Sequence, residues 1–184
     1  YSLHGITPGY RYHDAHAVQL FRDGEMDEWR RFGASVLERL RAEPGIDAAA
    51  LTTAAPLSVI GSWEIDLQLP DRPQAENYQA TLRRVAPGYL DTLEIPLLRG
   101  RDIGIDDRAD SAPVAIINQS LARASFGDAD PIGRRVGLPI GSGPRIQFTV
   151  VGVMADIRNS GPRALPQPEI LVPFAQSPWQ GMTF

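Results

Sequence analysis

The sequence predicts a mixed α+β fold, and three observations lead to this class. An apolar stripe with helical spacing runs over residues 27–42, between strand-like stretches at 17–22 and 46–53. Two later stretches, 63–69 and 78–85, alternate between apolar and polar residues as half-buried strands do. Further strands are predicted by short apolar runs at residues 114–117, 146–154 and 169–174.

The first predicted unit is a strand, a helix and a second strand. Asp27 is placed to cap the helix, and Pro44 with Gly45 ends it. The helix carries an apolar stripe made of Trp29, Phe32, Val36, Leu37 and Leu40. The short joins predict a βαβ unit with parallel strands and a right-handed crossover. Such a unit without a neighbour leaves a strand edge uncovered, so we expect either some self-association or loosely ordered chain ends.

The middle of the chain predicts a second, sheet-rich region. Residues 63–69 and 78–85 suit an antiparallel pair, with a loop at 56–62 before it and a turn at 70–73 inside it. The glycine-rich stretch 137–143 indicates a hairpin tip before the strong strand at 146–154.

Two residues mark the boundaries of the later elements. Asn118 is placed to cap a helix that ends at Gly127, with a narrow inner face of Leu121, Ala122, Ser125 and Phe126. Pro173 lies inside the last strand and favours an edge position or a bulge, because it has no N–H for a sheet ladder.

Residues 87–102 predict a structural joint between two parts of the domain. The proposed joint residues are Pro87, Gly88, Tyr89, Leu93, Pro96, Gly100 and Arg101. Pro87 suits the first turn of a short helix, and Pro96 ends the helical option. Tyr89 and Leu93 are expected to be buried, and Gly100 allows a turn with positive φ. No catalytic signature occurs in this stretch.

Composition excludes several functional classes. The net charge is −4 and the basic residues cluster only in pairs, which argues against nucleic acid as a partner. All 18 basic residues are arginine, so a phosphate-loop lysine and a Schiff-base lysine are absent. The sequence has no cysteine, which excludes thiol catalysis and disulfides. We therefore expect no enzyme activity and no cofactor.

Neither the histidines nor the acidic loop predicts a metal site. All three histidines, His4, His13 and His16, lie in a lead-in segment at residues 1–16 that has no helical pattern to fix ligands. The acidic loop at 102–113 lacks the ligand spacing of a calcium loop, and we interpret it as a solvated loop. A hydrolase that uses a pair of carboxylates stays open as an alternative.

Membrane attachment is expected outside these residues. No apolar run approaches the ~20 residues that span a bilayer, and no signal peptide is visible. The chain starts at Tyr1 and stops at Phe184 as though cut from a longer protein. We expect the parent gene to encode a membrane segment shortly before Tyr1.

These pieces together resemble the periplasmic core domain of MacB-type ABC transporter permeases, the macrolide-exporter-like family that includes acidobacterial-type permeases with two such domains. The resemblance runs from about Trp29 to Gln176, and its most specific block is VAPGYL at 85–90 followed by GRD at 100–102. Other blocks occur in the family's order: LERLRAEPGI at 37–46, LTTAAPL at 51–57, VAIINQSLAR at 114–123, DPIGRRV at 130–136, VVGVMADIR at 150–158 and EILVPFAQ at 169–176. The sequence departs at Leu90, where an aromatic is usual, and at Glu94, where glycine is usual.

The resemblance implies a two-lobed extracytoplasmic domain spanning residues 1–184. One lobe would be porter-like and built from βαβ units, at about 17–58 and 164–184. The other would be an inserted, mainly-β lobe at about 63–156. The domain would lie on the periplasmic face of the inner membrane and couple cytoplasmic ATP hydrolysis to export by conformational change.

The resemblance also implies partners and leaves an alternative. The partners would be a cytoplasmic ABC ATPase subunit or domain, a second permease copy as a dimer or tandem repeat, and a periplasmic adaptor. Within the same superfamily, a lipoprotein-releasing permease domain is the alternative, and an apolar cavity between the lobes would favour it.

Overall fold

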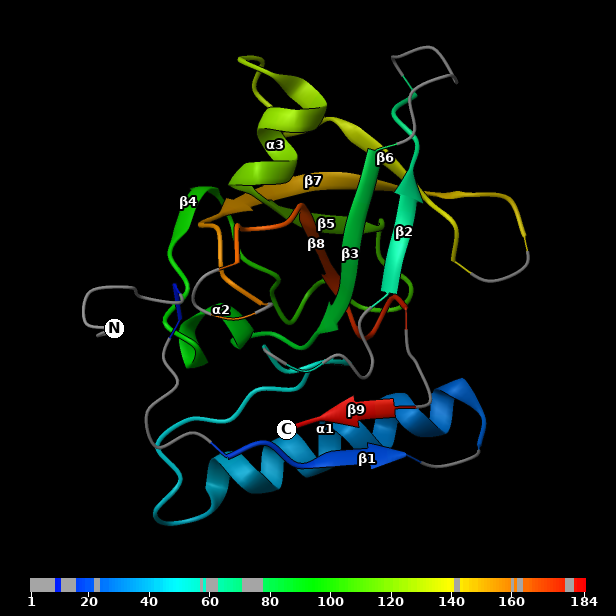
Figure 1. Ribbon diagram of the computed structural model, residues 1–184. Helices are drawn as coiled ribbons and strands as arrows, with labels where there is room; N and C mark the ends of the chain where they lie inside the picture. The colour runs from blue at the N-terminus through cyan, green and yellow to red at the C-terminus, as the bar shows by residue number, and fades with distance from the viewer. Residues whose placement is uncertain are drawn as a thin grey trace, which may run out of the picture.

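The computed structural model contains two sheets of very different size (Figure 1). It describes residues 9–10, 16–21, 24–56, 58, 63–70, 78–140, 143–159, 161, 164–177 and 181–184. Most of the lead-in segment, most of the 56–62 loop, the turn at 71–73 and the hairpin residues 141–142 lie outside these ranges. The expected α+β class is confirmed: a curled, mainly-β sheet is combined with a small helical part.

The smaller layer is built from both ends of the described chain. Strand β1 (Gln19–Phe21) pairs antiparallel with β9 (Gly181–Thr183), and helix α1 (Met26–Ala42) lies against this pair (Figure 1). Trp29 and Leu37 of the predicted stripe are buried in a core that also contains Leu51, Phe174 and Met182. Phe32 is 36% exposed, so the buried stripe is narrower than predicted.

Two expectations for this unit are corrected. Asp27 is not the helix cap: α1 begins at Met26 after Glu25, and Asp27 pairs with Arg30 inside the first turn. Residues 46–53 do not form a strand, and only Thr52 makes bridges, to Thr183 and to Val85. The alanines at 48–50 have low strand propensity, and β9 occupies the place beside β1. The chain near Thr52 therefore runs parallel to β1, but with β9 between them.

The larger sheet has seven strands in the order β2-β3-β8-β5-β7-β4, with β6 also paired to β7. Its strands are β2 (Trp63–Leu67), β3 (Tyr78–Val85), β4 (Leu97–Gly100), β5 (Val114–Asn118), β6 (Arg135–Leu138), β7 (Ile146–Met154) and β8 (Glu169–Pro173). The β2–β3 pair is antiparallel, which confirms the predicted pairing. β6 and β7 also pair antiparallel as a hairpin, but β6 includes Gly137 and Leu138 of the predicted tip. Gln68 also exchanges two hydrogen bonds with Gly137, so the β2 side curls round to meet β6.

Strand β8 is central in the sheet, so the expected edge position of Pro173 is wrong. It pairs parallel with β3 over five positions and antiparallel with β5 at Leu171 and Ile170 only. The Phe174 N–H donates to the Val85 carbonyl, so the neighbouring Pro173 nitrogen faces the β5 side. There the ladder has already ended, and the missing N–H leaves no partner unsatisfied.

Helix α3 (Gln119–Phe126) covers one face of the large sheet beside β7 (Figure 1). The Asn118 side chain accepts the Leu121 N–H at 2.9 Å, which confirms the predicted cap, and Leu121 and Ser125 are buried. Of residues 164–184, which the expected division assigns to the first lobe, β8 lies in the large sheet and β9 in the small one. Within the described residues, no helix combines the length and the apolar character needed to cross a bilayer.

Candidate functional site

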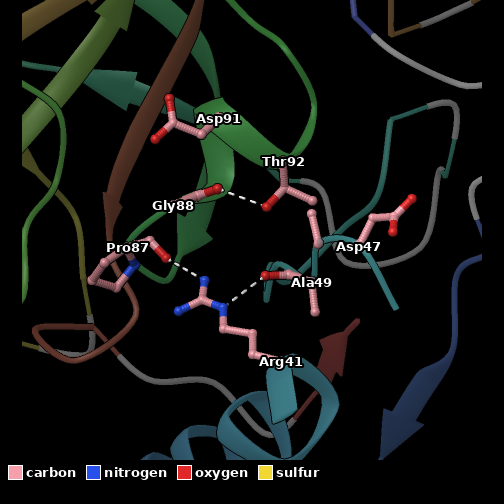
Figure 2. Close-up of a pocket in the computed structure, with 8 residues that line it drawn as sticks. Arg41, Asp47, Ala49, Pro87, Gly88, Asp91 and Thr92 are labelled. Atoms are coloured by element: carbon pink, nitrogen blue, oxygen red, sulfur yellow. Dashed lines mark hydrogen bonds between the residues drawn. The ribbon is translucent and has the colours of Figure 1, made fainter. Parts of the chain in front are cut away.

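The predicted joint lies where the small layer meets the large sheet (Figure 2). Helix α2 (Tyr89–Thr92) follows Gly88, whose φ of 86° places it in the left-handed region that favours glycine. Arg41, near the end of α1, donates from Nε to the Ala49 carbonyl at 3.0 Å and from Nη2 to the Pro87 carbonyl at 2.7 Å. One guanidinium therefore connects α1 to the segment that begins α2.

A cleft of about 430 Å³ opens beside this contact. Its lining is mostly polar or small, and is made of Arg41, Asp47, Ala48, Ala49, Pro87, Gly88, Asp91 and Thr92. One wall comes from the end of α1 and the segment after it, and the other comes from α2 (Figure 2). The width of the cleft therefore depends on the position of these two parts relative to each other. A lining with one cation and two carboxylates does not suit an acyl chain.

Burial of the joint differs from the prediction at one residue. Tyr89 is buried as expected, but Leu90 is the second buried side chain, and Leu93 is only partly buried against the same cluster. The helix has four residues and turns at Leu93, so Leu93 lies at its end rather than on its inner side. Among the described residues, the Tyr89 hydroxyl has no hydrogen-bond partner, and burial raises the pKa of this phenol well above its ordinary value.

Pro96 and Gly100 hold the joint against β7. The Ala155 N–H donates to the Pro96 carbonyl at 2.8 Å. Gly100 has a φ of 73°, which confirms its predicted positive φ, and a Cβ there would lie 2.1 Å from the Val151 carbonyl oxygen. Gly152, its partner across the ladder, is equally crowded, because a Cβ there would lie 2.4 Å from the Arg101 carbonyl oxygen. This close approach of two backbones excludes any side chain at either position.

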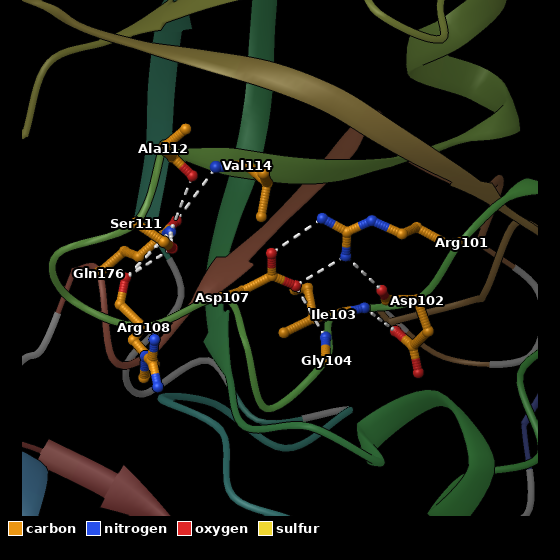
Figure 3. A network of polar contacts seen from close by, with 10 residues as sticks. All are labelled: Arg101, Asp102, Ile103, Gly104, Asp107, Arg108, Ser111, Ala112, Val114 and Gln176. Atoms are coloured by element: carbon orange, nitrogen blue, oxygen red, sulfur yellow. Dashed lines mark hydrogen bonds and ion pairs between the residues drawn. The ribbon is translucent and has the colours of Figure 1, made fainter.

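Arg101 organises the acidic loop that follows (Figure 3). Its Nη1 and Nη2 each donate to one Asp107 carboxylate oxygen at 2.8 Å, and Oδ2 of Asp107 also accepts the Gly104 N–H at 2.8 Å. The Asp107 side chain is 6% exposed. The loop is therefore a turn closed by a bidentate ion pair. Most of its residues are exposed or partly exposed, as predicted for a solvated loop, but Ile103 and Asp107 are buried.

The placement of the two shifted carboxylates in this loop does not match an acid–base pair. The hydrogen bonds from Arg101 lower the pKa of Asp107 below its ordinary value and raise the pKa of Arg101. Burial raises the pKa of Asp102, whose Oδ1 accepts the Ile103 N–H at 2.7 Å. In a hydrolase with an acid–base pair, two carboxylates face one cleft and are free to reach a substrate. Both Asp107 oxygens are instead bound by Arg101, and neither Asp102 nor Asp107 lines the cleft in Figure 2.

The far side of the loop is held by Gln176. Its Oε1 accepts the Val114 N–H at 3.0 Å, and its Nε2 donates to the Ala112 carbonyl at 3.0 Å and to the Ser111 Oγ at 2.9 Å (Figure 3). One side chain thus links the turn after β8 to the start of β5.

Metal ligands are not gathered in the described part of the chain. Among the described residues, no group of three or more His, Asp or Glu side chains is placed to hold an ion. His16 is exposed, and His4 and His13 lie outside the described residues.

The most deeply buried charges of the described chain lie on β3 and β8, and the sequence analysis did not predict their burial. Arg83 and Glu169 form an ion pair in which both side chains are 1% exposed. Arg84 is also buried, and burial lowers its pKa to about 10. The position of the two arginines could have predicted burial of one of them. They are adjacent residues in a strand, and adjacent strand residues point to opposite faces, so one of the two must face the interior.

One family model matches almost the whole chain, and two solved structures share its fold. The model of the MacB-like periplasmic core domain matches residues 6–183. The periplasmic region of MacB from Actinobacillus actinomycetemcomitans superposes with a TM-score of 0.59 at 19% identity, over 91% of this chain and 72% of that one. The extracellular domain of YknZ, an ABC-type transporter from Gram-positive bacteria, gives a TM-score of 0.55 at 19% identity, over 91% and 82%. No curated protein matches. The chain therefore belongs to the family of MacB-like periplasmic core domains.

Proposed function

We propose that this chain is the extracytoplasmic domain of an ABC transporter permease at the cytoplasmic membrane, and that it acts by conformational change. The family is one of transporter permease domains, so we assign no reaction to the chain itself. A cytoplasmic ATPase and a second permease copy are the proposed partners, and a periplasmic adaptor is a third. In this proposal ATP hydrolysis on the cytoplasmic side changes the orientation of the two lobes relative to each other, and this movement drives export.

The observation that carries the proposal is the build of the joint. Two sheets with separate cores meet across an open cleft, and Arg41 bridges its walls through backbone carbonyls at Ala49 and Pro87. Contacts of this kind can be exchanged for water at modest free-energy cost, whereas the buried clusters in each part resist deformation. A domain of this build favours rigid-body movement of one part against the other. Our proposal retains the two predicted lobes with changed boundaries: β1, α1 and β9 form the smaller lobe, and β8 belongs to the larger lobe.

Pulsed electron paramagnetic resonance on the intact permease with its ATPase tests this proposal. Residues 1–184 contain no cysteine, so once any cysteine elsewhere in the permease and its ATPase is replaced, Glu38→Cys with Arg123→Cys labels only the exposed faces of α1 and α3. We expect the distance distribution to shift between the ATP-trapped and nucleotide-free states. A control pair, Glu64→Cys with Arg123→Cys, lies entirely on the larger lobe and should not shift. Identical α1–α3 distributions in both states would refute lobe movement.

A further inference from the structure

We infer that Arg83 and Arg84 act as a two-sided clamp on two of the places where the chain crosses between the lobes. After Thr52 the chain leaves the small layer along an outgoing crossing, residues 53–56, and returns after β8 along a return crossing, residues 174–177. Each crossing is bound by one of these two adjacent arginines. The inference deepens the proposed function, because it names the residues that resist or permit movement between the lobes.

Arg83 holds the outgoing crossing. Its Nη1 donates to the Ala54 carbonyl, and also to the Ala55 carbonyl at 3.2 Å, while its Nε donates to the Glu169 carboxylate at the start of β8. Glu169 is fixed in turn, since its Oε2 accepts the Asn159 side-chain N–H at 2.9 Å. The guanidinium therefore joins the crossing to the centre of the large sheet.

Arg84 holds the return crossing. Neighbouring residues of a strand point to opposite faces, so Arg84 projects away from Arg83. Its Nε donates to the Ser177 Oγ at 2.9 Å, and its guanidinium carbon lies 5.8 Å from the centre of the Trp63 ring. Its backbone also exchanges hydrogen bonds with the outgoing crossing, donating to the Thr53 Oγ1 at 3.2 Å and accepting the Thr53 N–H at 3.0 Å.

Arg83 and Arg84 lie where the two sheets connect, and not in the core of one lobe alone. Thr52, directly before the outgoing crossing, pairs with Thr183 of the small layer and with Val85 of β3. The end of β3 is thus the place where the two sheets connect through backbone hydrogen bonds. Both arginines lie at this end, and their side chains reach the outgoing and the return crossing, two segments that bend if the lobes move.

Residue-resolved hydrogen exchange on this chain alone tests the clamp. We expect Arg83→Gln to speed exchange at the Ala54 N–H, and Arg84→Gln to speed exchange at the Ser177 N–H, each about tenfold, as expected for losing a hydrogen bond from a charged donor. Exchange at Val150, in the core of the large sheet, should stay unchanged. Arg123→Gln, on the exposed face of α3, is the matched control.

Two further variants keep the test decisive if Arg83→Gln does not fold. Arg83→Met with Glu169→Met removes the carbonyl contacts without leaving a buried charge unpaired, and Ser177→Ala removes only the acceptor of Arg84. Faster exchange confined to the matching crossing supports the clamp. Exchange equal to the control, or a uniform rise that includes Val150, overturns it. No ATPase takes part, so this result is independent of whether nucleotide moves the lobes.

Discussion

Glu94 adopts a backbone conformation that normally belongs to glycine. Its φ is 52°, and among the described residues it is the one non-glycine residue with a positive φ. The resemblance to MacB-type domains already marked this position as one where glycine is usual. The left-handed region brings Cβ too close to the following carbonyl, and Glu94 bears that strain directly before the buried Ile95.

Replacing Glu94 should therefore separate backbone strain from side-chain contacts. Both Glu94→Gly and Glu94→Ala remove the carboxylate, but only glycine relieves the strain, so we expect Glu94→Gly to be about 1 kcal/mol more stable than Glu94→Ala. Urea denaturation of the two variants measures this difference. Equal midpoints would show that the left-handed conformation costs nothing here.

The buried arginines show where residue-level prediction stops. From the sequence, Arg83 and Arg84 were recognised only as one of several pairs of basic residues, and Glu169 only as the first residue of a predicted strand. Their burial was not predicted. Periodicity places one of two neighbouring strand residues inside, but it cannot show that the other face is covered as well. That covering comes from Ser177 and Trp63, which are distant in sequence, and no local signal reports it.

At the scale of elements, helix α2 is a short anchor whose inner side is set by Tyr89 and Leu90. We expect Leu90→Ala to lower the free energy of unfolding by about 2–5 kcal/mol, because it leaves a cavity in a buried cluster. Leu93→Ala should cost clearly less, since that side chain is only partly buried. Thermal and urea melts of the two variants give the comparison. A larger loss for Leu93→Ala would restore the original assignment of Leu93 as the anchor.

The loop from Arg101 to Asp107 should carry a pH signature. The folded-state pKa of Asp107 is lowered from 3.8, so its charged form stabilises the fold above 3.8, and this contribution is lost as the pH falls through the lower folded value. Asp107→Asn should therefore be less stable than the natural chain at pH 7, and the gap should narrow as the pH falls below 3.8. Urea melts across this pH range measure the gap. A gap that does not change with pH would mean that the ion pair contributes no net stability.

Element prediction succeeded where local signals decide and failed where neighbours decide. Alternation identified β2 and β3 with their pairing, and Asn118 identified the start of α3. The order of the strands in the sheet could not be predicted from the sequence. β3 and β8 are neighbours in the sheet but far apart in the chain, and no connecting turn indicates that they pair. Residues 46–53 were predicted as a strand from their composition, but β9 takes the position beside β1. Pro173 was predicted at a sheet edge because proline cannot donate to a neighbouring strand. The sequence does not show that the β5–β8 pairing ends before Pro173, which lets the proline lie in a central strand.

At the scale of the whole molecule, β9 covers the edge that a lone βαβ unit would leave open. It lies between β1 and Thr52, with hydrogen bonds from Val18 to Phe184 and from Thr183 to Thr52 among those that hold it. We expect deletion of residues 181–184 to cause concentration-dependent dimerisation, because two strand edges lose their partner. Met182→Ala is the control, since it removes core packing but keeps the backbone. Light scattering across a dilution series measures the mass, and a monomeric truncated chain would contradict this expectation.

The central position of β8 also constrains the order in which this domain can be made. Arg83 and Glu169, on adjacent strands, are 86 residues apart in the chain. A ribosome or a translocation pore delivers β2, β3, β5 and β7 first, and the sheet has a gap in its middle until β8 emerges. Contacts of such long range form late and slowly. The chain should therefore cross a membrane as an open, unfolded segment, and close only after nearly all of it has reached the far side.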